Sequence, residues 1–196
     1  MGRRLRWFGL ALIVLLAGLL LVAWTPDTDA AAMRAKYGAP PSQYVDLGVN
    51  QVFHLRDEGP RDAPVLILLH GSNATLHDWD EWVDRMKTVY RVVRFDQTGH
   101  GLTGPSPTGD YSRAAFVDTV DRVANHLRLG RFALAGNSMG GGVALDYAVA
   151  HPDRLSALVL VAPAGAAYAT RSTPWAFRVV QMPALRPLHA IDPPEQ

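Results

Sequence analysis

The chain of 196 residues contains no cysteine. Disulfide bridges, a thiol nucleophile and thiolate metal sites are therefore excluded. The sequence also lacks a strong charge of either sign, because its 19 basic and 18 acidic residues give a formal net charge of +1. Nucleic-acid-binding domains usually carry a basic excess, so we expect no nucleic-acid partner. With 48% hydrophobic and 19% charged residues, the composition is typical of one globular domain.

The N-terminal segment contains a long stretch without charge, WFGLALIVLLAGLLLVAW, from Trp7 to Trp24, and three arginines precede it. A helix of roughly 18 residues nearly crosses a hydrocarbon core of about 30 Å. We therefore expect residues 1–25 to be a membrane anchor in a lipid bilayer, with the soluble part on the extracytoplasmic side, because the arginines stay in the cytoplasm. The alternative is a cleaved signal peptide, with a small-residue site at 30–32 and a secreted or periplasmic product.

The rest of the chain alternates between strand-like and helix-like patterns. Residues 26–42 are polar, contain alanine and proline, and are interpreted as a linker. After this linker we expect a β-hairpin within 44–57, strands at 65–69, 90–96, 131–136 and 155–163, and helices at 76–86, 112–129 and 139–151. This order is typical of a parallel α/β sheet with right-handed crossovers.

One hydroxyl interrupts the apolar segment ALAGNSMGGGVAL. It belongs to Ser138, which lies where a predicted strand gives way to a predicted helix, with Gly136 two residues before it and Gly140 two residues after it. A nucleophile at the tip of such a turn has a strained backbone, and larger side chains at the two glycine positions would collide with it or with neighbouring backbone. The amide of Met139, at the helix start, would then face an incoming oxyanion.

This segment resembles the nucleophile elbow of the α/β-hydrolase superfamily, and the resemblance extends from about residue 43 to 170. Two further motifs support it: LLHGSN ends an earlier strand, and FDQTGHGLTG ends the strand between them. The string GNSMGG is similar to that of the serine-nucleophile branch, which contains carboxylesterases, lactonases and C–C bond hydrolases. The resemblance implies an α/β fold with a mostly parallel sheet flanked by helices, in which 43–170 form a partial core and 171–196 begin a cap.

The same resemblance implies the other parts of the site. The second oxyanion donor is the backbone amide of Ser72, which follows the His-Gly pair at the end of the earlier strand. Asn73 is a candidate helper, and His70 and Gly71 are expected to support the loop by hydrogen bonding. No cofactor and no metal are implied, and the acidic residues at 78–84 are interpreted as a solvated helix face.

Other polar residues receive structural interpretations. Asp96 and His100 lie in a loop after a predicted strand and are expected to cap that turn. His54, His77 and His126 show no partner pattern and are interpreted as surface or packing residues.

A serine hydrolase of this type needs an acid and then a histidine after the nucleophile in the chain. The residues after Ser138 do not fill that order: His151 belongs to a helix-ending turn, and His189 precedes Asp192. We therefore expect a truncated chain whose general base lies beyond residue 196, and which is inactive as given.

The sequence thus predicts a serine hydrolase that cleaves an ester, lactone or related acyl-type bond of a small-molecule substrate. A non-catalytic binding module on the same fold and an inactive remnant are the alternatives.

Overall fold

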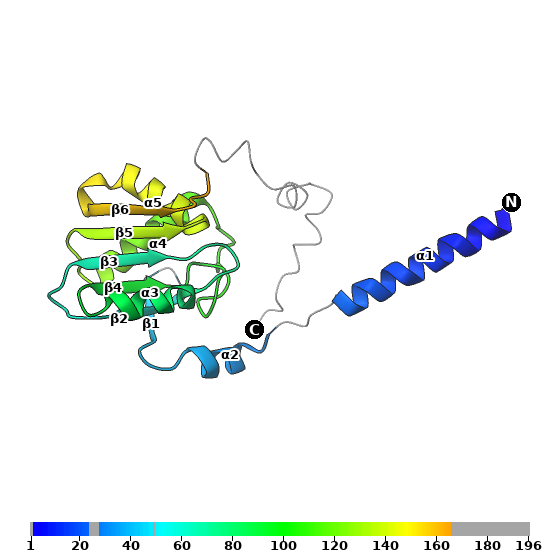
Figure 1. Ribbon diagram of the computed structural model, residues 1–196, viewed down its shortest axis with the longest axis horizontal. Helices are drawn as coiled ribbons and strands as arrows, with labels where there is room; N and C mark the ends of the chain where they lie inside the picture. Colours follow the sequence, from blue (N-terminus) through cyan, green and yellow to red (C-terminus); the bar gives the residue numbers. More distant parts are fainter. Residues whose placement is uncertain (1, 24–27, 49, 166–196) are drawn as a thin grey trace. The chain divides into compact units, whose positions relative to one another are not determined.

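The computed structural model describes residues 2–23, 28–48 and 50–165 (Figure 1). The chain divides into two compact units, Met1–Tyr37 and Gly38–Gln196. The predicted cap segment, 171–196, lies outside the described residues.

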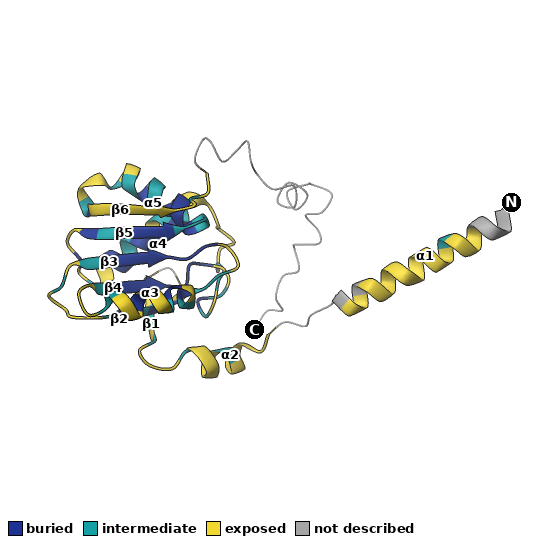
Figure 2. Ribbon diagram, in the orientation of Figure 1, coloured by how far each residue is buried: buried dark blue, intermediate teal, exposed yellow. Residues whose placement is uncertain are grey.

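The first unit contains two helices, α1 (Gly2–Ala23) and α2 (Ala30–Tyr37). The predicted N-terminal helix is present, and its described apolar side chains are mostly exposed (Figure 2). Within the described residues, however, no helix combines the length and apolarity needed to cross a membrane, so the predicted membrane-spanning helix is not supported. Helix α2 forms inside the predicted linker, where the Asp29 carboxylate accepts a hydrogen bond of 2.8 Å from the amide of Ala31 at the helix start.

The second unit is built on a six-stranded sheet with the order β1-β2-β4-β3-β5-β6. Strands β3, β4, β5 and β6 are parallel, and β1 and β2 form the predicted antiparallel hairpin, which joins the sheet through β4 (Figure 1). The predicted parallel α/β sheet is thereby confirmed. The strands are β1 (Gln43–Asp46), β2 (Val52–Glu58), β3 (Val65–Leu69), β4 (Arg91–Phe95), β5 (Phe132–Asn137) and β6 (Leu155–Val161).

Helices cover both faces of this sheet. The elements are the 3₁₀ turn η1 (Leu76–Trp79), α3 (Asp80–Met86), α4 (Arg113–His126), α5 (Met139–Ala150) and the 3₁₀ turn η2 (Pro152–Arg154). The larger core cluster contains side chains of α4 and α5 on one face, and the smaller one contains Trp79 and Val83 on the other. The fold is therefore a three-layer α/β arrangement around a central sheet.

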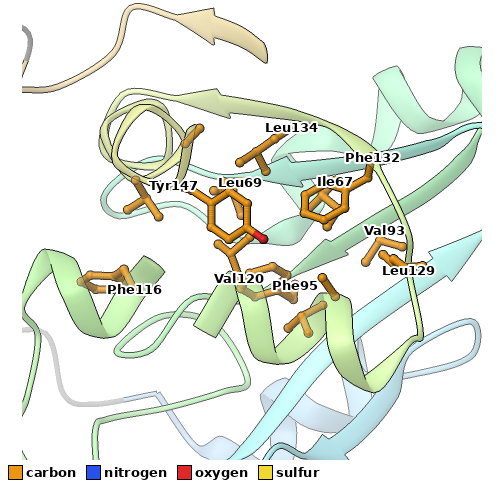
Figure 3. Close-up of a cluster of buried hydrophobic side chains, with 14 of the residues drawn as sticks. Ile67, Leu69, Val93, Phe95, Phe116, Val120, Leu129, Phe132, Leu134 and Tyr147 are labelled. Atoms are coloured by element: carbon orange, nitrogen blue, oxygen red, sulfur yellow. The ribbon is translucent and has the colours of Figure 1, made fainter. Parts of the chain in front are cut away.

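Strand β3 explains why the central strands are apolar throughout. Its side chains alternate, so Ile67 and Leu69 enter the larger cluster while Leu66 and Leu68 enter the smaller one. Figure 3 shows the larger cluster, in which the Tyr147 ring of α5 lies among side chains of β3, β5 and α4. The predicted strand buried on both faces is confirmed.

Two element boundaries differ from the predictions. The predicted helix over 76–86 begins as a 3₁₀ turn, which Thr75 caps with its hydroxyl and Asp78 with its carboxylate. Helix α4 begins as predicted, with the Ser112 hydroxyl accepting from the Ala115 amide at 3.2 Å. It ends at residue 126 instead of 129, because Arg128 adopts a left-handed conformation (φ 53°) that closes the helix two residues before Gly130.

Candidate active site

Ser138 lies in the turn between β5 and α5 with φ 50° and ψ −115°. A positive φ is strained for a residue with a side chain, by about 1–3 kcal/mol. Three backbone hydrogen bonds hold it there: the Ser138 amide donates to the Val161 carbonyl at 2.9 Å, and the Ser138 carbonyl accepts from the amides of Ala164 at 2.8 Å and Gly142 at 3.1 Å. The turn is thus fixed by the adjacent strand β6, the segment that follows it and the first turn of α5.

The two glycines that flank Ser138 are required by crowding in this turn. A Cβ atom built on Gly136 would lie 2.2 Å from the carbonyl oxygen of Gly140. A Cβ atom built on Gly140 would lie 2.5 Å from the carbonyl oxygens of both Leu69 and His70. The contacts are with backbone, which cannot move aside as a flexible side chain could, so only glycine fits at 136 and 140.

The loop after β3 lies directly beside the serine. A Cβ atom on Gly71, which is buried, would lie 3.2 Å from the Cβ atom of Ser138. Ser72 and Asn73 follow in the loop and are exposed, Asn73 with φ 55°. Met139 begins α5, and the amide groups of a first helical turn have no partner inside the helix. The structure therefore brings the predicted nucleophile and the predicted oxyanion loop together.

His70 fixes the orientation of this loop. Its ring is buried, its Nδ1 donates to the Gly71 carbonyl oxygen at 2.8 Å, and its Nε2 accepts from the Gln97 amide at 3.0 Å. Burial lowers the pKa of His70 below its ordinary value and outweighs the opposing effect of the Gly71 hydrogen bond. The ring is therefore neutral, with its proton on Nδ1, and it holds the Gly71–Ser72 peptide so that the Ser72 amide points away from the ring.

Asp96 caps the next loop, as the sequence predicts. Its carboxylate accepts hydrogen bonds of 2.8 Å from the amides of Leu76 and Leu102 and one of 2.7 Å from Nδ1 of His54. Burial raises the pKa of the Asp96 carboxyl, but these hydrogen bonds outweigh burial and hold the pKa below its usual range. His100 contributes to the same turn through the Thr98 carbonyl, 3.1 Å from its Nδ1.

His54 is a buried residue and not a surface one, and it has polar partners that the sequence does not indicate. Its ring is fully buried, with Nδ1 on Asp96 and Nε2 2.8 Å from the hydroxyl oxygen of Ser42. These partners are 42 and 12 residues away in the sequence. Ser42 and Asp96 reach His54 only because β2 pairs with both β1 and β4. No pattern in the neighbouring sequence predicts these contacts.

The acidic face of η1 and α3 is only partly solvated. Asp84 is exposed, as predicted, and it pairs with Lys87. The Asp80 side chain is 47% exposed and also accepts hydrogen bonds from His77 and from the buried Arg94, which the sequence does not indicate. A buried guanidinium needs a carboxylate partner, and Asp80 supplies one. Across the described ranges, no group of three or more metal-ligating side chains is found.

No described histidine reaches the Ser138 hydroxyl, which makes no hydrogen bond with any residue of the described part of the chain. His151 ends α5, at the other end of the helix from Ser138, where its ring packs 4.7 Å from that of Tyr147. Asp146 pairs with Arg113. His189 and Asp192 lie outside the described residues.

A cavity of about 390 Å³ lies between β2, the loop before α4 and α4 itself. Gln51, Thr98 and Ser112 are among the residues that line it, and none of the predicted site residues does. This cavity is therefore separate from the serine turn.

Comparison with known proteins shows which family the chain belongs to. The family model described as alpha/beta hydrolase fold matches residues 64–185, which include the His70 loop, the Asp96 loop and the serine turn. The chain belongs to the α/β-hydrolase fold family. It is 33% identical over 106 residues to the 2-hydroxymuconate semialdehyde hydrolase of Pseudomonas sp. (strain CF600), an alignment that covers 53% of this chain and 38% of that protein.

Solved structures of α/β hydrolases are similar as well. An epoxide hydrolase from metagenomes of hot environments superposes with a TM-score of 0.66 at 26% identity, covering 75% of this chain and 53% of that one. A carboxylesterase of Bacillus subtilis superposes with a TM-score of 0.60 at 26% identity, covering 69% and 47%. The chain spans 38% to 39% of the length of the first curated relatives that it matches.

Proposed function

We propose that Ser138 is the nucleophile of a hydrolase that cleaves an ester, lactone or related acyl-type bond in a small molecule. The observation that carries this proposal is the position of Ser138: a strained turn at the carboxyl end of β5, against the Gly71 loop at the carboxyl end of β3. Strain of this kind persists only where the surrounding structure enforces it, and it is common at catalytic residues. The carboxylesterase and the semialdehyde hydrolase among the similar proteins support hydrolytic chemistry.

In the proposed reaction the Ser138 oxygen attacks the carbonyl carbon of the substrate. The amides of Ser72 and Met139 donate hydrogen bonds to the oxygen that becomes negative. Because both donors belong to the backbone, they are oriented before the reaction begins, and one such donor is worth about 3–4 kcal/mol of the barrier. His70 contributes by holding the Gly71–Ser72 peptide in place.

The proton of the Ser138 hydroxyl needs an acceptor. We assign this role to a group outside the described residues, because neither His151 nor His70 is placed for it: one packs on Tyr147, and the other has both ring nitrogens engaged in the loop.

A fluorophosphonate probe tests the nucleophile. The probe phosphonylates an activated serine, and tryptic peptide 132–154 contains Ser138 as its one serine. We expect the label in this peptide and its loss from the peptide in Ser138→Ala. An unlabelled peptide 132–154 in folded protein, together with tight binding of a small ligand, would instead identify a binding module.

We propose separately, from the sequence alone, that the N-terminal segment holds the hydrolase domain on the extracytoplasmic side of a membrane. The uncharged stretch from Trp7 to Trp24 and the three preceding arginines support it. Fractionation of cells tests it, because the full chain should remain with membranes after a carbonate wash. Recovery of the full-length chain in the soluble fraction would overturn it.

A further inference from the structure

Three side chains outside the serine turn form a continuous hydrogen-bonded series. The Ser42 hydroxyl oxygen lies 2.8 Å from Nε2 of His54, and Nδ1 of His54 lies 2.7 Å from the Asp96 carboxylate. Serine, histidine and aspartate linked through these two ring nitrogens are the functional arrangement of a serine nucleophile with its base and the acid that orients the base. Here the series is complete within the described residues.

The proton positions in this series follow from its donors and acceptors. The Asp96 carboxyl, whose pKa is held below its usual range, is ionised and can only accept, so Nδ1 of His54 carries a proton. In the neutral ring, Nε2 is then an acceptor, and the hydroxyl of Ser42 donates to it. With a neutral ring, the Ser42 hydroxyl oxygen therefore lies 2.8 Å from a nitrogen that can take its proton.

A cation lies next to the same oxygen. Nε of Arg56 donates to the Ser42 oxygen at 3.0 Å. This hydrogen bond occupies one lone pair of the oxygen and does not use the hydroxyl proton. The positive charge also favours the negative charge that develops when the proton leaves, and that effect is stronger at a partly buried site than in water.

The position of Ser42 allows access from solvent. Ser42 immediately precedes β1 and is half-buried, whereas His54 and Asp96 behind it are buried. In the order of the sheet, β1 is at the opposite side from β5, which carries Ser138. The two serines are therefore separate sites, and modification of one can be observed without the other.

We propose that Ser42 is a second nucleophilic serine, which takes an acyl or phosphonyl group from an activated donor with His54 as the base. This inference is independent of the proposed role of Ser138. With a fluorophosphonate, a bond forms between the Ser42 oxygen and phosphorus while the phosphorus–fluorine bond breaks. Fluoride leaves with the bonding pair, and the hydroxyl proton passes to Nε2 of His54 and then to solvent.

The test uses the full chain carrying Ser138→Ala, so that the first site cannot react. The protein is treated with a fluorophosphonate, digested with trypsin and analysed by mass spectrometry. Peptide 37–56 contains Ser42 as its one serine, and peptide 95–113 contains Ser106 and Ser112. The latter two hydroxyls contact Thr108 and the Ala115 amide instead of a histidine, so peptide 95–113 is an internal control.

We expect peptide 37–56 to be labelled at least about tenfold faster than peptide 95–113, since a positioned base typically contributes a factor of about 100 to 10,000. Ser42→Ala should abolish that label, and His54→Gln should reduce it. The decisive comparison is between peptides 37–56 and 95–113 of the same protein, in which Ser42, His54 and Asp96 are unchanged. It therefore does not depend on whether His54→Gln folds. Equal labelling of the two peptides would overturn the proposal, whether or not Ser138 reacts in the unaltered protein.

Discussion

His70 donates a hydrogen bond of 2.8 Å from its Nδ1 to the carbonyl oxygen of its neighbour Gly71. The carbonyl of Gly71 and the amide of Ser72 belong to one peptide plane, so this bond sets the direction of the proposed oxyanion donor. Protonation of the ring would keep this bond but break the second one, because a protonated Nε2 could no longer accept from the Gln97 amide.

This arrangement predicts a pH-dependent loss of stability. The pKa of His70 is lowered in the folded protein from its ordinary value of 6.5, mainly by burial. Between the two pKa values the unfolded chain binds more protons, so the free energy of unfolding is at its full value above pH 6.5 and falls as the pH decreases below it. Urea denaturation from about pH 7.5 to about pH 5 measures this decline.

The matched variants are His70→Gln and His126→Gln. His70→Gln removes the titrating group and should flatten the decline, although it also lowers stability at neutral pH by about 1–3 kcal/mol through the lost hydrogen bonds. His126 is exposed at the end of α4, so its replacement should leave the slope unchanged. Equal slopes in all three proteins would show that His70 does not contribute.

Gly136→Ala should destabilise the domain by about 3 kcal/mol or more, because the added Cβ atom would lie 2.2 Å from the carbonyl oxygen of Gly140. Gly130→Ala is the control, since a Cβ atom there meets nothing within 4 Å, and its effect should stay within about 0.5 kcal/mol. Thermal and urea unfolding compare the two variants. Equal losses in the free energy of unfolding for the two variants would contradict the close packing described for the serine turn.

Asp57→Asn should lower the free energy of unfolding by about 3 kcal/mol. The side chain is buried on β2, where Arg91 binds it through two hydrogen bonds of 2.9 and 2.7 Å and Arg61 adds an ion pair. Burial raises the pKa of the Asp57 carboxyl, but the two arginines outweigh burial and lower it below 3.8. The stabilisation is therefore present above about pH 4 and is lost as the pH falls further.

Asp84→Asn provides the comparison for Asp57. The Asp84 side chain is 70% exposed and its pair with Lys87 is solvated, so this change should alter the free energy of unfolding by less than about 1 kcal/mol. Urea unfolding at pH 7 measures both variants, and a similar loss for the two would contradict the assigned difference in burial.

The sequence predicts the parts of the fold that depend on neighbouring residues. The alternation in β2, the apolar run of β3 and the hydroxyl cap at Ser112 are all local signals, and each element formed where its signal lies. The crowding at Gly136 is local in the same sense, since it arises from the Gly140 carbonyl within one strand-turn-helix unit. The crowding at Gly140 is not local, because it comes from the carbonyls of Leu69 and His70.

The parts that the sequence does not predict depend on contacts between distant strands. His54 acquires Ser42 and Asp96 only through strand pairing, and Asp80 acquires Arg94 only because α3 packs over β4. A histidine with no partner nearby in the sequence can be exposed, packed in the core or hydrogen-bonded. The pattern of residues around His54 therefore could not predict its buried, hydrogen-bonded position. The general base that we propose for Ser138 differs from these cases, because none of the described histidines is placed for that role.

The most direct test of the central claim is a crystal structure of the phosphonylated protein. We expect phosphorus bonded to the Ser138 oxygen, with the phosphonyl oxygen within about 3 Å of the amide nitrogens of both Ser72 and Met139. A phosphonyl oxygen directed away from these two amides, or an unmodified Ser138 in a folded domain, would contradict it.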